Sequence, residues 1–170
     1  MTISETLKGK IKIHLKERQF EDIILTWILN GNSNEKKYTF DVLKNLSFVV
    51  ENFNIIKKDE KNCIVVENIC KEIKQNLFTK IMDKLNSDKY GLQNKDMGNI
   101  NIRCWMITIL CLCCDENNLD ECLSFIEKCL EDNVEKYTKY FSLEGSINCI
   151  DKNISHYQEK IKSLFDKIKI

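Results

Sequence analysis

The chain has no proline and no alanine, and it has only five glycines among 170 residues. Proline is the strongest breaker of helices, and glycine supplies the tight turns that a β-sandwich or β-barrel needs. Their scarcity therefore favours an all-helical fold. The hydrophobic fraction of 43% beside 31% charged residues excludes a disordered chain. Because the length suits one sizeable core, we expect a single helical domain over residues 1–170.

An excess of charge of either sign is also missing, since 26 basic residues balance 26 acidic ones. No global field then draws the chain to nucleic acid, and we expect no nucleic-acid partner. Arginine occurs only at Arg18 and Arg103. The abundance of lysine and asparagine beside the missing alanine and proline indicates an AT-rich genome rather than a chemical role.

Cysteine, by contrast, is plentiful, with nine residues. The odd number and the polar start without a signal peptide predict a reducing cytosol. Three pairs have members two helical turns apart, about 10 Å along a helix axis, which is too far for a disulfide or for one metal ion. We therefore interpret the thiols as core packing, with a cysteine-rich metal-binding domain as the alternative. The pairs are Cys63 and Cys70, Cys104 and Cys111, and Cys122 and Cys129.

The first half of the chain carries apolar residues at helical spacing. One helical stretch ends at Asn30-Gly31, and a polar loop leads to a second helix near residues 37–54. Two shorter helices are expected, one carrying apolar residues from Ile64 to Ile73 and the other from Leu77 to Leu85, and residues 86–99 are expected to form the longest loop. The stripe of the second helix is formed by Leu43, Leu46, Val50 and Phe53.

Residues 104–114 form an almost wholly apolar run in which only Thr108 is conventionally polar. The run is longer than a typical strand of about 5–6 residues and shorter than the roughly 20 residues that span a bilayer, so it predicts a buried central helix. The next helix is expected to open at Asn118, with Glu121 completing a capping box, and to carry one apolar face as far as Tyr137. We expect a break near residues 142–146 and a last amphipathic helix after residue 155.

No catalytic motif appears along the chain. There is no glycine-rich phosphate loop, no HExxH sequence and no nucleophile elbow. The two histidines, His14 and His156, have no sequence-level link to a cysteine nucleophile. We therefore expect no enzyme activity, no catalytic residue, no cofactor and no metal.

The order of these helices, with an apolar central helix late in the chain, resembles the Bcl-2 family. The segment Ile100-Asn-Ile-Arg103, at the start of the central helix, is similar to the Bcl-2 homology 1 region, with Arg103 as its arginine. Residues 41–53 resemble the second helix of the divergent poxvirus members. The resemblance implies a viral Bcl-2-like bundle of about seven to eight helices around a buried hydrophobic helix.

The resemblance also implies a function. Anti-apoptotic members hold the death-motif (BH3) helices of pro-apoptotic host Bcl-2 proteins in an apolar surface groove. Arg103 would pair there with the aspartate of the bound helix and fix its register. The expected groove is lined by Leu43, Leu46, Val50, Phe53, Asn101, Arg103 and Met106.

The resemblance leaves an alternative. In a second viral class the groove is filled, and outer faces bind innate-signalling proteins of the NF-κB pathway. We expect a cytoplasmic location in the host cell, or the outer mitochondrial surface. Membrane association is expected only if a C-terminal tail is missing from this chain, because residues 161–170 are amphipathic and too short to span a bilayer. A homodimer is left open.

Overall fold

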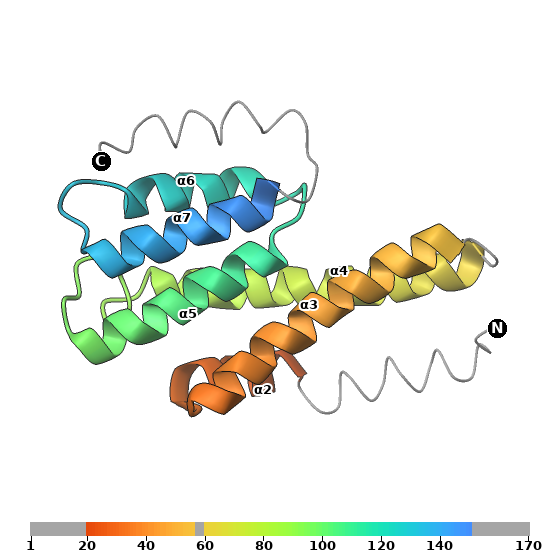
Figure 1. The fold of residues 1–170 in the computed structure, drawn as a ribbon, viewed down its shortest axis with the longest axis horizontal. Helices are drawn as coiled ribbons and strands as arrows, with labels where there is room; N and C mark the ends of the chain where they lie inside the picture. The colour runs from red at the N-terminus through yellow and green to blue at the C-terminus, as the bar shows by residue number, and fades with distance from the viewer. Residues whose placement is uncertain (1–19, 57–59, 151–170) are drawn as a thin grey trace. The chain divides into compact units, whose positions relative to one another are not determined.

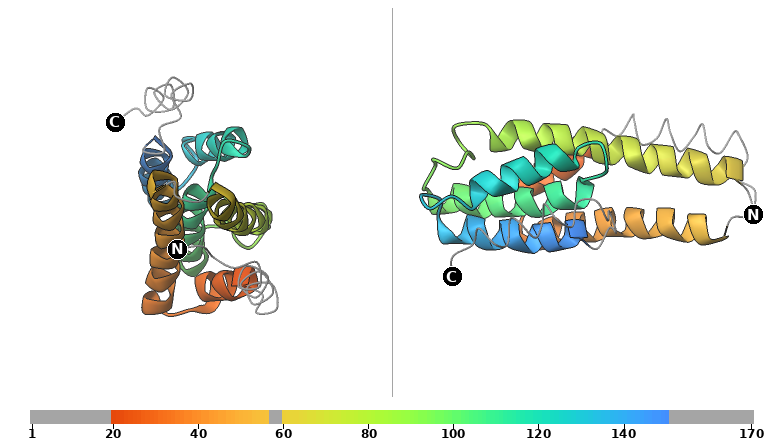
Figure 2. Two further views of the ribbon diagram at one scale, coloured as in Figure 1. Left: turned by 90° about the vertical axis from the view of Figure 1, so that its right-hand side faces the viewer. Right: turned by 90° about the horizontal axis from the view of Figure 1, so that it is seen from above.

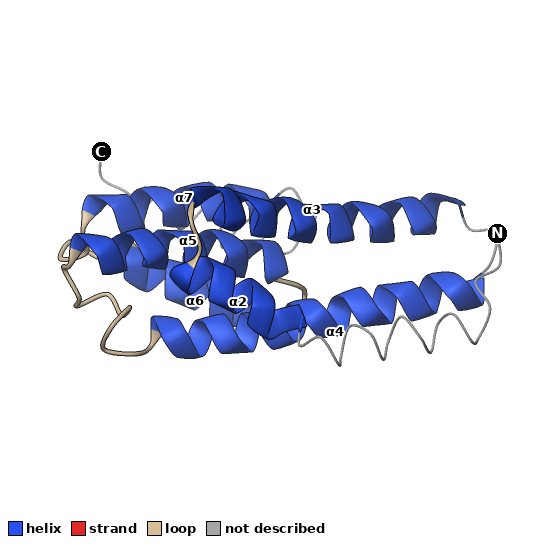
Figure 3. Ribbon diagram, turned by 90° about the horizontal axis from the view of Figure 1, so that it is seen from below, coloured by secondary structure: helices blue, strands red, loops and turns tan. Residues whose placement is uncertain are grey.

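The computed structural model describes residues 20–56 and 60–150. Within those ranges the chain forms helices joined by turns and loops, and no strand occurs there (Figure 3). The all-helical class is thereby confirmed. The expected last helix and the first part of the N-terminal one lie outside the described residues, so the number of helices stays a prediction.

Two compact units divide the chain, Met1–Leu77 and Phe78–Ile170, and each is described by itself. Because no finding tests whether the chain is one domain, that expectation stays a prediction. Helix α4 runs across the boundary between the units, α2 and α3 precede it, and α5 to α7 follow it (Figure 1). The helices are α2 (Phe20–Asn30), α3 (Ser33–Ile56), α4 (Glu60–Leu85), α5 (Met97–Cys113), α6 (Leu119–Cys129) and α7 (Lys136–Ile150).

Helix α3 begins earlier than the sequence pattern predicted. Asn32 Oδ1 accepts the Glu35 N–H at 2.9 Å, and Glu35 Oε1 accepts the Asn32 N–H at 3.2 Å. This reciprocal pair is a capping box with asparagine in the capping position, and it satisfies N–H groups that a helix start otherwise leaves unpaired. The polar loop before α3 is therefore shorter than expected, because its asparagine and glutamate start the helix.

Helix α4 is continuous where the sequence pattern predicted two shorter helices. It runs for 26 residues from Glu60 to Leu85. The polar stretch Lys74-Gln-Asn76, which lies between the two expected apolar segments, contains neither proline nor glycine. Polar residues on the outer side of a helix do not interrupt its backbone hydrogen bonds, so the expectation of two helices was wrong.

Helix α5 is the buried helix of the second unit. Ten of its 17 residues are buried, which agrees with the apolar run from Cys104 onward. The helix begins at Met97, earlier than expected, because the Asp96 carboxylate caps it by accepting the Asn99 N–H at 3.1 Å. The expected loop of residues 86–99 therefore ends at Asp96.

Helices α5 and α7 run alongside each other in the same direction (Figure 2). Arg103 of α5 donates a hydrogen bond to Thr138 of α7, and about two turns further along both helices Cys111 lies against Gly145. A Cβ placed on Gly145 would lie 2.6 Å from Cys111 Sγ. Glycine therefore lets the two helices approach where any larger residue would clash.

The position of the break after α6 differs from the prediction. Helix α6 ends at Cys129 and α7 begins at Lys136, whereas residues 142–146 lie in the middle of α7. Serine and glycine there were interpreted as a break, but Ser142, Gly145 and Ser146 are small residues in the side of α7 that packs inside the unit. The expected capping box of α6 is also absent, because Asn118 Oδ1 accepts the Asp115 N–H at 2.7 Å instead.

Candidate functional site

The groove residues predicted on α3 lie in the first unit. Leu43 is fully buried at 0% exposure. Leu46, Val50 and Phe53 belong to α3, but their side chains lie outside the described residues. The burial of Leu43 shows that this part of the stripe is core.

The groove residues predicted on α5 lie in the second unit. Asn101 is exposed, whereas Arg103 and Met106 are both fully buried at 0% exposure. Asn101 is therefore the one residue of these three that a partner reaches without a rearrangement. The groove that would combine the α3 and α5 residues stays a prediction.

The Arg103 guanidinium lies at the centre of a buried hydrogen-bond network. Its Nη1 donates to the carbonyl oxygens of Gly91 at 2.6 Å and Asn94 at 3.0 Å, both in the loop before α5. Its Nε donates to Thr138 Oγ1 at 3.0 Å, and its Nη2 lies 3.4 Å from Glu135 Oε1. Four hydrogen bonds thus use most of the five N–H groups of arginine. The network fastens the loop and the start of α7 to α5.

Glu135 is the acidic member of this network and also caps α7. Its carboxylate accepts hydrogen bonds from the N–H groups of Tyr137 at 2.7 Å and Thr138 at 2.6 Å, and from the Thr138 hydroxyl. Burial opposes ionisation of Glu135, but these hydrogen bonds and the one from Arg103 outweigh it, so its pKa lies below the usual value of 4.5. The carboxylate is therefore charged at neutral pH and balances the buried guanidinium.

Arg103 thus differs from the exposed contact that the resemblance implies. Within the described residues no buried side-chain nitrogen or oxygen lacks a hydrogen-bond partner. A carboxylate from another protein could reach the guanidinium only by displacing Glu135 or a loop carbonyl. In this structure Arg103 is an internal connector, and a role toward a partner stays a prediction.

The cysteines of α5 and α6 are buried thiols, and none of those described is in a disulfide. Burial raises the pKa of Cys104 to about 11 and the pKa of Cys129 to about 12. Since the thiolate is the nucleophile and the metal ligand, both groups are poorly suited to either chemistry at neutral pH. No group of three or more histidine, cysteine or acidic residues in the described ranges could hold a metal ion. The metal-binding alternative therefore finds no support there.

A cavity of about 500 Å³ lies between α6 and the end of α4 with the loop that follows it. Leu85, Leu92 and Phe125 are its apolar lining residues, and the rest of the lining is polar or charged apart from Gly91. The loop wall is held in place because Arg103 binds the Gly91 and Asn94 carbonyls. The sequence indicated only a long loop here, since nothing in it marks the contact with α6.

Sequence reasoning also missed an exposed apolar face on α7. Tyr137, Tyr140 and Ile147 are 46%, 61% and 48% exposed. Their spacing of three and seven residues could have indicated one helical face, but the break predicted at residues 142–146 separated them.

None of the helices in residues 20–56 and 60–150 is long and apolar enough to cross a membrane. No protein-family model matches the chain, and neither a curated protein nor a solved structure matches it. The function must therefore be argued from the residues themselves.

Proposed function

We propose that the chain is a non-enzymatic protein-interaction domain of the viral Bcl-2-like type that blocks a host defence response by binding a partner protein. The observation that carries the proposal is α5, a buried helix with Arg103 near its start that packs beside α7. A buried apolar helix surrounded by amphipathic ones is the arrangement that the sequence resemblance implies. This observation supports the type of fold, and the resemblance supports the partner.

The first candidate partner is the death-motif helix of a pro-apoptotic host protein, which would make the chain an apoptosis inhibitor. Such a helix is amphipathic, and its apolar residues at i, i+3, i+4 and i+7 would enter a groove beside α5. Among the predicted groove residues on α5, Asn101 is the exposed one, and it is two residues before Arg103. Binding through Arg103 itself would require a bound aspartate to replace Glu135.

Titration of fluorescein-labelled death-motif peptides against the protein, followed by fluorescence anisotropy, tests this candidate. We expect saturable binding with a dissociation constant below about 10 μM, and no binding of a peptide whose apolar anchors and aspartate are replaced. Asn101→Arg should weaken binding about tenfold, because a long cationic side chain would occupy the groove edge. Ser124→Arg, at an exposed position on α6, is the matched control. Absence of binding at about 100 μM for every peptide would rule this candidate out.

The second candidate is the closed-groove class, which binds innate-signalling proteins through outer faces. Three observations favour it. The Arg103 guanidinium is satisfied inside its own unit, and Met106 is fully buried. Large apolar side chains are instead exposed on α7.

Assays of NF-κB reporter activation and of caspase activation, in host cells that express the protein, separate the two candidates. For the closed-groove class, we expect the protein to suppress NF-κB reporter activation while it leaves death-motif-driven caspase activation unchanged. Tyr140→Glu should abolish the suppression, and Asn101→Arg should not. The opposite pattern would support death-motif binding and exclude the closed-groove class.

A further inference from the structure

The outward face of α7 carries one continuous stripe of exposed residues. Tyr137, Tyr140, Glu144 and Ile147 follow one another at positions i, i+3, i+7 and i+10, and each is exposed. These positions fall on one side of a helix with 3.6 residues per turn. We call them the α7 stripe.

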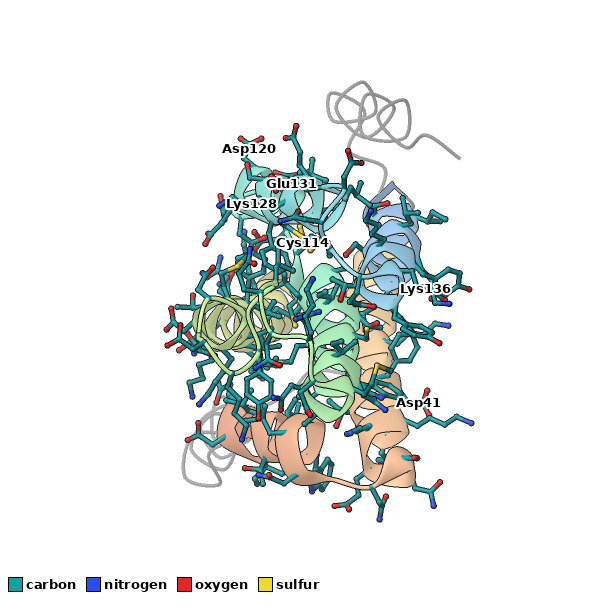
Figure 4. All side chains as sticks on the ribbon, turned by 90° about the vertical axis from the view of Figure 1, so that its left-hand side faces the viewer. Asp41, Cys114, Asp120, Lys128, Glu131 and Lys136 are labelled. Carbon is teal, nitrogen blue, oxygen red and sulfur yellow. The ribbon has the colours of Figure 1, made fainter. Side chains whose placement is uncertain are left out.

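The opposite side of α7 already has its partner inside the unit. Thr138 and Ser142 are fully buried at 0% exposure, and Thr138 bonds to Arg103 of α5. Gly145 lies against Cys111, also on α5. The α7 stripe therefore faces away from α5, and Figure 4 shows Lys136 on the same outer side of the helix.

Exposed apolar area is concentrated on this stripe. Among the described residues, six large hydrophobic side chains are exposed, and three of them belong to the α7 stripe. Two are tyrosines, a residue type that is enriched in protein–protein interfaces. An apolar stripe of this kind beside charged residues marks a contact surface rather than a solvated face.

The charged residues of α7 indicate which molecule binds the α7 stripe. Lys136 lies four residues before Tyr140 and Glu144 lies four residues after it, and both are exposed. The Lys136 ammonium is 5.3 Å from the centre of the Tyr137 ring, so it is held at the edge of the stripe. A helix that carries a cation and an anion at equal distances from a central tyrosine is complementary to its own antiparallel copy.

We infer that the α7 stripe is the contact face of a homodimer, in which two copies of α7 pack antiparallel around a two-fold axis at Tyr140. Each Lys136 then lies beside Glu144 of the other copy, and the two Tyr140 rings meet at the axis. A parallel pair would instead oppose lysine to lysine and glutamate to glutamate, which is unfavourable. This inference does not depend on death-motif binding, whereas a partner of the closed-groove class that bound the exposed residues of α7 would compete with the dimer for the same face.

Sedimentation velocity of the full chain between about 2 and about 300 μM tests the dimer. A contact through one helix of 15 residues is small, so we expect a dissociation constant of about 10–100 μM. Rising salt should weaken the dimer, because the end contacts are ionic. A sedimentation coefficient that stays monomeric across the whole range would overturn the inference.

Charge reversal tests the antiparallel register. Glu144→Lys and Lys136→Glu, each alone, should raise the dissociation constant about tenfold or more, whereas the double variant should return it to within about threefold of the wild type. Glu121→Lys, an exposed residue on α6, is the control of matched charge change and should have no effect. Thermal unfolding of each variant serves to check that it is folded. The proposed face would be overturned if neither charge reversal changed the dissociation constant of the dimer, or if the double variant dimerised more weakly than either single variant.

Discussion

Arg103 and Glu135 form an ion pair inside the second unit, with Nη2 and Oε1 3.4 Å apart although 32 residues separate them in the sequence. The arginine side chain is 0% exposed and the glutamate side chain 17% exposed. Because the same carboxylate caps α7 and the same guanidinium holds the loop before α5, the pair connects α5, that loop and the start of α7. It is a structural contact whether or not a partner also uses Arg103.

Replacing Arg103 with methionine should destabilise the protein strongly. The substitution leaves Glu135 and the Gly91 and Asn94 carbonyls without their donor, and removal of one member of a buried pair costs about 3–5 kcal/mol. Urea unfolding followed by circular dichroism measures the loss. Arg103→Lys should lose less than methionine but should not restore the wild type, because an ammonium cannot make the forked contacts of a guanidinium.

The control for this prediction is the double variant Arg103→Met with Glu135→Gln. It removes the uncompensated charge, so it should be more stable than Arg103→Met alone. A loss below about 1 kcal/mol for Arg103→Met would contradict the structural role of the network.

Ionisation of Glu135 should contribute to the pH dependence of the unfolding free energy. Its pKa in the folded protein lies below the usual 4.5, so the folded state favours the ionised form. The contribution to stability is therefore present above pH 4.5 and is lost as the pH falls through the lowered pKa. Urea unfolding of the wild type and of Glu135→Gln from about pH 6 to about pH 2.5 measures it. The difference in unfolding free energy between the two proteins should shrink on acidification, and a constant difference would refute the assignment.

Close packing of α5 on α7 predicts the effect of a methyl group at Gly145. In an open helix, Gly→Ala gains about 1 kcal/mol of helix propensity. Here the new Cβ would lie 2.6 Å from Cys111 Sγ and 3.2 Å from its Cβ, and overpacking of a core costs about 1–3 kcal/mol. We expect Gly145→Ala to destabilise the protein by about 1 kcal/mol in denaturant unfolding.

A double-mutant cycle separates packing from propensity at this position. In a Cys111→Ala background the sulfur is absent, so Gly145→Ala should be less destabilising than in the wild type. A stabilised Gly145→Ala variant in the wild-type background would show that α7 moves away from α5 at no cost, contrary to the close approach described above.

The apolar pattern was a reliable guide to the buried helix and an unreliable one to the ends of helices. The run from Cys104 to Cys114 predicted α5 because its composition alone demands burial on all sides. The start of α3 was misjudged because Asn32 and Glu35 cap through side-chain hydrogen bonds that hydrophobic spacing does not record. The break before α7 was misplaced because Gly145 has a packing role that only the neighbouring helix reveals.

The candidate site shows the same limit. Arg103 was singled out because arginine is rare in the chain and stands at the start of the apolar helix. The sequence could not show that its partners are Glu135 and Thr138, since contacts between residues more than 30 positions apart depend on how α5 and α7 pack. An arginine at a helix start has the same local pattern whether it faces a groove or the interior.

Burial predicts that Cys104 and Cys129 are slow to react with thiol reagents. At pH 9 a thiol of the unfolded chain, with its pKa of 9.0, is half ionised, whereas Cys129, with a pKa of about 12, stays protonated. We expect both residues to react with iodoacetamide at least about 100-fold more slowly in the native protein than in urea, measured for each site by peptide mass spectrometry. Ser124→Cys places a thiol at an exposed position of α6 and should react equally fast in both states. If Cys104 or Cys129 were labelled as fast as that control thiol, the two residues could not be the buried packing groups of α5 and α6.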